Sequence, residues 1–119
     1  MNNTTISGNI ASDPEIWYSP DGLARATFRM AVDRRWQDQR TGDWNEATSY
    51  FDVVAHDEMA ENIALTLEVG SRVIVSGVLI QRGVPTSDDE RVYGKVEIVA
   101  DDVAVSLKFN ALYSTTEYA

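Results

Sequence analysis

The sequence predicts a small all-β protein: a closed five-stranded Greek-key barrel with one short helix between the third and fourth strands. Three observations lead to this fold class. Most segments carry an apolar residue at every second position, one segment has helical periodicity, and explicit turn sequences separate the segments. The chain has 119 residues and no internal repeat, which fits a single domain.

Period-two alternation is the dominant pattern. Between Ala24 and Val32, apolar side chains alternate with Arg, Thr and Ala, which is typical of a strand buried on one face. Residues 72–82 are rich in β-branched side chains, which favour strands. In the last predicted strand we expect a break at Asp101 and Asp102. The predicted strands are residues 4–10, 24–32, 50–56, 72–82 and 91–107.

One segment departs from the alternation. Met59, Ile63 and Leu67 recur every four residues and form one stripe of an amphipathic helix, which we expect Asp57 to cap. Turns are predicted at residues 19–22, 37–45 and 86–90, where Gly, Pro and acidic residues cluster. The resulting order β–β–β–α–β–β is that of the OB-fold.

The composition leaves little room for catalysis or metal chemistry. The chain has no cysteine and one histidine, which excludes disulfides, thiolate metal sites and sites with several histidines. His56 is the only imidazole that could activate a Ser or Thr nucleophile. We therefore expect no enzyme activity, no cofactor and no metal site.

The N-terminal segment and the apolar runs bear on location. Residues 1–5 carry no charged side chain and lead into no long apolar stretch, so we expect no signal peptide. No run approaches the ~18 apolar residues of a membrane span. We expect a cytoplasmic protein that does not bind membranes.

The net charge of −9 is unevenly distributed. Residues 1–42 contain five Arg and five acids and are neutral, whereas residues 43–119 carry the whole excess of acids. Eight of the ten basic residues are Arg, the planar cation suited to phosphates and bases. A local basic surface on an acidic body is compatible with this distribution.

Aromatic residues near these arginines suggest base stacking. Trp36 follows Arg34 and Arg35 and precedes a polar loop, which favours stacking on a nucleobase over core packing. For Tyr50, which shares a predicted strand face with His56, the two interpretations stay equally open.

The other aromatic residues are better explained by packing. For Trp17 and Trp44, half-buried strand positions are the favoured interpretation, with DNA stacking as the alternative. Tyr18 and Phe51 are expected in the core.

An ordered series of short motifs resembles bacterial single-stranded DNA-binding proteins. No motif is specific by itself, but their order is, and the resemblance covers residues 4–107. The stretch 72–77 and the segment 106–109 are most similar to members from high-GC Gram-positive bacteria. The motifs are Gly8-Asn9, Asp13-Pro14-Glu15, Tyr18, Pro20, Gly22, Trp36, Thr41-Gly42, Val53-Val54, Ala60-Glu61, Gly70-Ser71 and Gly77.

This resemblance implies an OB-fold domain over residues 1–107 and sequence-tolerant binding of single-stranded DNA in replication, recombination and repair. It also implies a homotetramer arranged as a dimer of dimers, and for residues 108–119 a strand that clamps neighbouring subunits. Family members usually continue into an acidic tail that recruits replication and repair proteins. Residues 108–119 do not have the composition of such a tail.

The family's stacking positions fall on Trp36, Tyr50, His56 and Val84, of which Val84 cannot stack. The family's basic positions are partly replaced, by Asp52, Glu58 and Glu68. The expected DNA-binding residues are Trp36, Tyr50, His56, Arg29, Arg34, Arg35, Arg40, Arg82, Trp17 and Trp44.

These replacements and the charge of −9 support an alternative function. The chain could be an OB-fold protein-interaction module of the primosome type, with weak affinity for DNA. A small enzyme is a further alternative, which the missing nucleophile–base pair disfavours.

Overall fold

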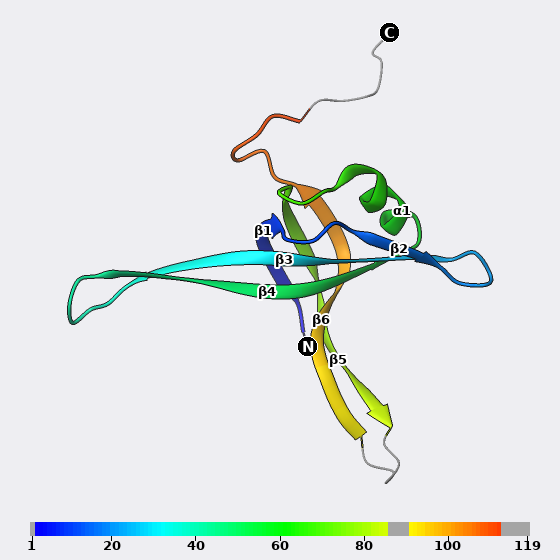
Figure 1. Cartoon of the computed structure of the whole chain (residues 1–119), viewed down its shortest axis with the longest axis horizontal. Coiled ribbons are helices and arrows are strands. Elements are labelled where there is room, and N and C mark those ends of the chain that lie inside the picture. Colours follow the sequence, from blue (N-terminus) through cyan, green and yellow to red (C-terminus); the bar gives the residue numbers. More distant parts are fainter. Residues whose placement is uncertain (1, 86–90, 113–119) are drawn as a thin grey trace.

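The computed structural model describes residues 2–85 and 91–112, and within these ranges it gives no side-chain description for Arg82, Val84, Pro85, Arg91, Val92 and Tyr93. The described chain forms strands and one helix (Figure 1). In chain order they are β1 (Thr4–Ile10), β2 (Glu15–Tyr18), β3 (Ala24–Gln37), β4 (Trp44–His56), α1 (Asp57–Thr66), β5 (Arg72–Pro85) and β6 (Arg91–Val105).

The strands form one sheet that closes on itself. Their order is β1-β5-β6-β4-β3-β2, and β1 also pairs with β3, at Asn9 with Ala31 and at Ile10 with Met30. The pairing is antiparallel except between β4 and β6. The predicted OB-fold is confirmed, because β1, β3, β4, β5 and β6 make the barrel and α1 lies between the third and fourth of them.

The barrel interior is filled by the alternating apolar residues. In β3 the side chains of Ala24, Ala26, Phe28 and Met30 are buried, while Arg25 and Arg29 between them are exposed. The helix closes the barrel with Ala60 and Ile63, and the buried apolar side chains of the described residues, apart from Val54, form one cluster. Its members are Ile10, Ala24, Ala26, Phe28, Met30, Val53, Ala55, Ala60, Ile63, Leu67, Val73, Val75, Ile98 and Ala100.

Two places in the barrel require particular local geometry. A Cβ on Gly8 would overlap the carbonyl oxygen of Ala31, so only glycine lets β1 cross β3 where the barrel closes. The predicted break in the last strand is a β-bulge at Asp101, since Ser76 pairs with Asp102 and Gly77 pairs with Ala100.

Two local expectations were wrong. Tyr18 is 59% exposed rather than part of the core, because it lies on the short strand β2 at the edge of the sheet. Asp57 does not cap the helix; His56 occupies the N-cap position, and Asp57 itself has a φ of 60°. Phe51 packs partly buried against the core, as expected.

The β3–β4 hairpin extends beyond the barrel on the side away from α1 (Figure 1). Both strands continue past their predicted ends, pairing without interruption as far as Gln37 and Trp44. We call its outer part, residues 33–48, the arm. No helix in the described residues is long and apolar enough to cross a membrane.

Candidate nucleic-acid interface

The arm ends in a compact turn stabilised by its own side chain. The Asp38 carboxylate accepts hydrogen bonds from the backbone N–H groups of Arg40 (2.8 Å) and Thr41 (3.3 Å). The backbone N–H of Gly42, which has a φ of 74°, donates to the Asp38 carbonyl at 2.8 Å. The turn therefore holds Arg40 at the tip of the arm, and no side-chain partner of Arg40 is found among the described residues.

The strand register sorts the predicted site residues onto two faces. Directly opposite residues of an antiparallel pair point to the same face, as do residues two apart in one strand. Arg25 lies opposite His56, Arg29 opposite Asp52, and Arg35 opposite Glu46. We call this side of the hairpin the outer face; its proposed ligand-binding side chains are Arg25, Arg29, Arg35, Trp44, Tyr50 and His56.

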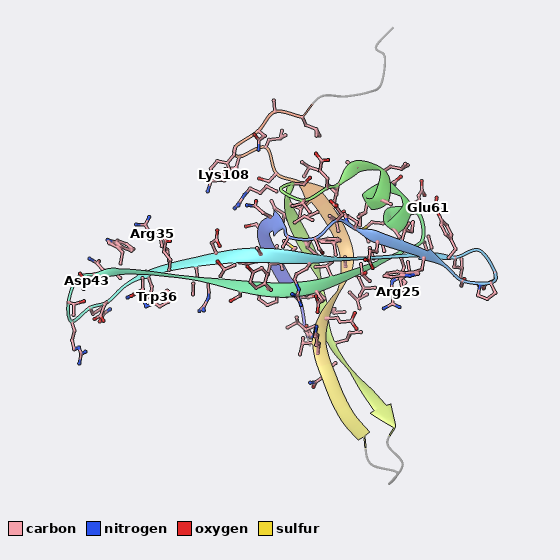
Figure 2. All side chains as sticks on the ribbon, viewed as in Figure 1. Arg25, Arg35, Trp36, Asp43, Glu61 and Lys108 are labelled. Atoms are coloured by element: carbon pink, nitrogen blue, oxygen red, sulfur yellow. The ribbon has the colours of Figure 1, made fainter. Side chains whose placement is uncertain are left out.

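Arg34 and Trp36 lie on the other face of the arm, because they alternate with Arg35 and Gln37 in β3. Figure 2 shows Arg35 and Trp36 on opposite sides of the hairpin. The two groups of predicted residues are therefore not one flat patch. They surround the arm.

Each aromatic ring of the arm has a guanidinium close to it. Arg34 lies 5.6 Å from the Trp36 ring centroid, and Arg35 lies 4.9 Å from that of Trp44. These separations are within the range of cation–π attraction. The rings remain accessible, since Trp36 is 45% exposed and Trp44 is 59% exposed.

Tyr50 lies where the arm joins the barrel, and it is also exposed, at 59%. Arg29 lies 5.8 Å from its ring centroid. The core alternative for Tyr50 is therefore wrong, because its ring is on the surface of the outer face next to a cation. Base stacking on Tyr50 stays a prediction.

A row of three side chains crosses the sheet at the other end of the outer face. Trp17 of β2 pairs with Arg25 of β3, which pairs with His56 of β4. A hollow of about 430 Å³ lies beside this row, with Leu23 and Asp57 also in its wall. Trp17 is 49% exposed, which fits the expected half-buried strand position, and stacking on DNA stays the alternative for its exposed half.

Sequence reasoning missed two cations of this surface. Arg25 makes no ion pair or side-chain hydrogen bond within the described part of the chain, yet it lies between Trp17 and His56. Its alternation with Arg29 in the strand pattern was the available signal. Lys95 comes from β6, and only the parallel pairing of β4 with β6 brings it to Asp52.

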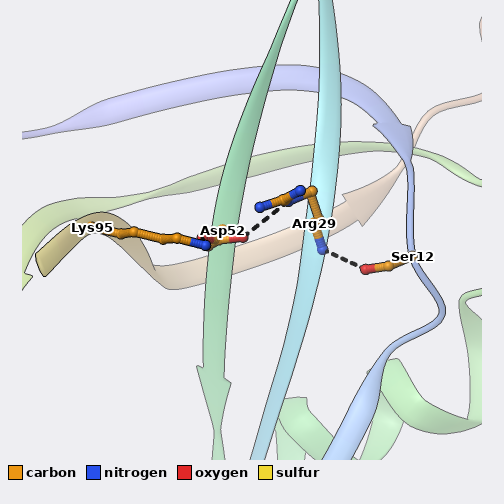
Figure 3. A network of polar contacts seen from close by, with 4 residues as sticks. All are labelled: Ser12, Arg29, Asp52 and Lys95. Carbon is orange, nitrogen blue, oxygen red and sulfur yellow. Dashed lines mark hydrogen bonds and ion pairs between the residues drawn. The ribbon is translucent and has the colours of Figure 1, made fainter.

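Several carboxylates share the surface with the cations. Arg35 pairs with Glu46 at 3.5 Å, with both side chains mostly in solvent. Such exposed pairs contribute little and open easily. Arg29 and Lys95 both contact Asp52, and the backbone N–H of Arg29 donates to Ser12 Oγ at 3.0 Å (Figure 3).

Arg82 and the acids of the helix belong to elements outside the β3–β4 hairpin. The backbone of Arg82 belongs to β5, but its side chain, like that of Val84, lies outside the described residues. Figure 2 shows Glu61 on α1, at the end of the molecule away from the arm. Among the described residues, no group of three or more potential metal ligands was found.

Comparison with known proteins identifies relatives over nearly the whole chain. Residues 1–106 match the model of the Single-strand binding protein family. The single-stranded DNA-binding protein of Mycobacterium tuberculosis (strain ATCC 25618 / H37Rv) is 39% identical over 106 residues, covering 88% of this chain and 64% of its own length. That of Corynebacterium glutamicum is 40% identical over 108 residues, covering 90% of this chain and 48% of its own length.

Solved structures give the same result for the fold. The structure described as Plasmodium falciparum SSB complex with ssDNA has a TM-score of 0.77 and 25% identity, and the match covers 89% of this chain and 95% of that one. A small single-stranded DNA-binding protein from Streptomyces coelicolor has a TM-score of 0.71 and 28% identity, covering 93% and 99%.

Proposed function

Because the chain belongs to the single-strand binding protein family, we propose that it binds single-stranded DNA without catalysing a reaction and protects it during replication, recombination and repair. One observation carries the proposal: exposed aromatic rings and guanidinium groups lie next to one another along the outer face of the β3–β4 hairpin, and again at Arg34 and Trp36 on the other face of the arm. Rings accept bases of any sequence, and guanidiniums accept phosphates.

The proposed DNA path follows the hairpin. Bases stack on Trp17, His56 and Tyr50 along the outer face, and then on Trp44 and Trp36 as the strand passes around the arm. Phosphates are held by the cations next to these rings. The proposed phosphate contacts are Arg25, Arg29, Arg34, Arg35, Arg40 and Arg82.

Fluorescence titration tests this function. Oligo-dT is added to the protein at low salt while tryptophan emission is recorded, because stacking on Trp36 or Trp44 should quench it. Strong quenching that salt reverses supports DNA binding. Absence of quenching, together with unchanged anisotropy of a labelled oligo-dT, overturns the proposal.

We further propose that the protein acts as a homotetramer, a dimer of dimers, in the cytoplasm with the nucleoid, and that it works with replication and repair proteins. Exposed apolar side chains after β6 support an assembly role for that segment: Leu107 is 65% exposed and Phe109 is 67% exposed. Residues 108–119 are proposed as the clamp strand. The molar mass of the assembly, measured by light scattering with and without these residues, tests this. A tetramer in both cases would contradict the proposed clamp strand.

A protein-interaction module with weak DNA affinity is the second candidate function. The net charge of −9 and the two cations engaged by Asp52 favour it. The same titration separates the two functions, because this candidate requires that even low salt gives no binding of oligo-dT.

A further inference from the structure

Asp52 lies in the middle of the outer face and contacts two of its cations. Its Oδ1 is 3.3 Å from Arg29 Nε, and its Oδ2 is 3.9 Å from Lys95 Nζ (Figure 3). Arg29 is directly opposite Asp52 on the neighbouring strand, so the register itself brings the two together. The carboxylate therefore uses both oxygens to bridge β3 and β6.

These cations are not buried. The Arg29 side chain is 47% exposed, that of Lys95 is 75% exposed, and that of Asp52 is 32% exposed. Each pair is consequently weak enough to be exchanged for another anion. A DNA phosphate that approaches Arg29 or Lys95 meets a cation that already has a counter-charge.

The surroundings of Asp52 reinforce this effect. A groove of about 500 Å³ lies beside it, and its wall includes Asp13, Glu15 and Glu97 in addition to the two cations. Among the described residues of this wall, carboxylates outnumber cations, which disfavours a phosphate in the groove. Arg25 and Arg40, toward the two ends of the path, show no such ion pair within the described residues.

We propose that Asp52 is an intramolecular competitor of DNA: it occupies Arg29 and Lys95 in the free protein, and phosphates must displace it. This inference rests on the proposed function and deepens it. The middle of the path then depends mainly on the Tyr50 ring, because Arg29 can hold a phosphate only after Asp52 has left it, whereas Arg25 and Arg40 toward the ends need no such displacement. Asp52 lowers the affinity for single-stranded DNA and makes it less sensitive to salt, because salt also screens the ion pairs that DNA has to break.

The decisive variant is Asp52→Asn, which keeps the shape of the side chain and removes its charge. Anisotropy of a fluorescein-labelled oligo-dT is measured at a series of NaCl concentrations for the wild-type protein and the variant. We expect the variant to bind about fivefold more tightly at low salt, since up to two exposed ion pairs no longer have to open. The plot of log affinity against log salt should steepen by about 0.7 for each cation that is freed.

Asp33→Asn is the matched control. Asp33 lies on the outer face too, opposite Thr48, whose hydroxyl donates to its carboxylate at 2.8 Å. This variant removes one negative charge from the same hairpin without freeing Arg29 or Lys95. It should leave the salt slope unchanged, so an equal steepening in both variants would overturn the competitor role.

A double variant links the effect to its cation. Adding Arg29→Gln to Asp52→Asn should cancel most of the gain in affinity, as expected for coupled neighbours. Asp52→Thr, which also suits a strand, serves as a second charge-removing variant in case the amide impairs folding. Binding by the wild type with no gain in either Asp52 variant overturns this proposal alone, whereas absence of binding in all proteins overturns the proposed function with it.

Discussion

At two places in the arm, an aromatic side chain lies next to an arginine side chain. Arg34 with Trp36 and Arg35 with Trp44 have both groups exposed and close together, although each pair points to a different face. A base that stacks on such a ring places its own phosphate within reach of the guanidinium. We expect each aromatic side chain and the guanidinium beside it to serve one nucleotide, the ring through its base and the cation through its phosphate.

Trp36→Ala should weaken binding of oligo-dT about tenfold or more, because one stacked base contributes about 1–3 kcal/mol. Trp36→Phe keeps a ring and should retain most of the affinity. Trp36 is 45% exposed and lies outside the core cluster, so the unfolding temperature should hardly change. Anisotropy of labelled oligo-dT gives the affinity of both variants, and circular dichroism gives their unfolding temperatures. Equal binding by the Ala and Phe variants would show that no base stacks on Trp36.

Arg25→Gln should weaken binding and flatten the salt dependence by about 0.7, since it removes one phosphate contact that no carboxylate of the described residues competes for. Arg25→Lys is the control, because it keeps the charge and should keep the slope. The same salt series shows both effects. A slope that is unchanged in the Gln variant would mean that DNA does not reach the β2–β3 end of the outer face.

At the scale of elements, the barrel and the arm have different roles. The barrel strands alternate buried and exposed side chains, whereas every β3 residue from Asp33 to Gln37 is exposed. Nothing in the arm belongs to the core cluster. The hairpin is therefore a continuation of two barrel strands whose side chains are free to serve binding rather than stability.

Replacing residues 33–48 with an Asn-Gly turn should test this division. Val32 and Ser49 are directly opposite, so a two-residue turn can join them without changing the register of the barrel. We expect an unfolding temperature within about 4 °C of the wild type, because little apolar surface is lost. Affinity for oligo-dT should fall by more than in any single variant of the arm; retention of wild-type affinity would place the DNA elsewhere.

At the scale of the whole molecule, charge opposes the ligand. The chain carries −9, and the carboxylates of Asp13, Glu15, Asp52 and Glu97 line the groove beside the middle of the path. Long-range attraction of DNA is then weak, and binding depends on stacking at short range.

The salt dependence of affinity should therefore be shallower than that of the Mycobacterium tuberculosis relative measured on the same oligonucleotide. Each phosphate that a protein neutralises contributes about −0.7 to the slope for single strands. Titrations of both proteins across one NaCl series give the comparison. A steeper slope in this protein would contradict the limited number of phosphate contacts.

The local pattern of residues was sufficient for the fold class. Period-two alternation, one helical stripe and the turn sequences predict the OB-fold, and Ala24 to Met30 are buried in the alternation expected. The same pattern underestimated the length of β3 and β4. In the arm neither face of these strands packs on the core, so polar residues such as Arg34 and Asn45 replace the apolar alternation that predicts a strand. Strand β2 was missed because it has only four residues.

The sequence by itself determined which chemistry is present: rings and guanidiniums around Trp36, and no thiol. Only the tertiary structure decided how these groups are combined. Pairing across strands placed Arg25 between Trp17 and His56. The extension of β3 as far as Gln37 turned the consecutive residues Arg34 and Arg35 to opposite faces. It also brought Lys95 and Arg29 to one carboxylate, since residues far apart in the chain meet only when the barrel closes.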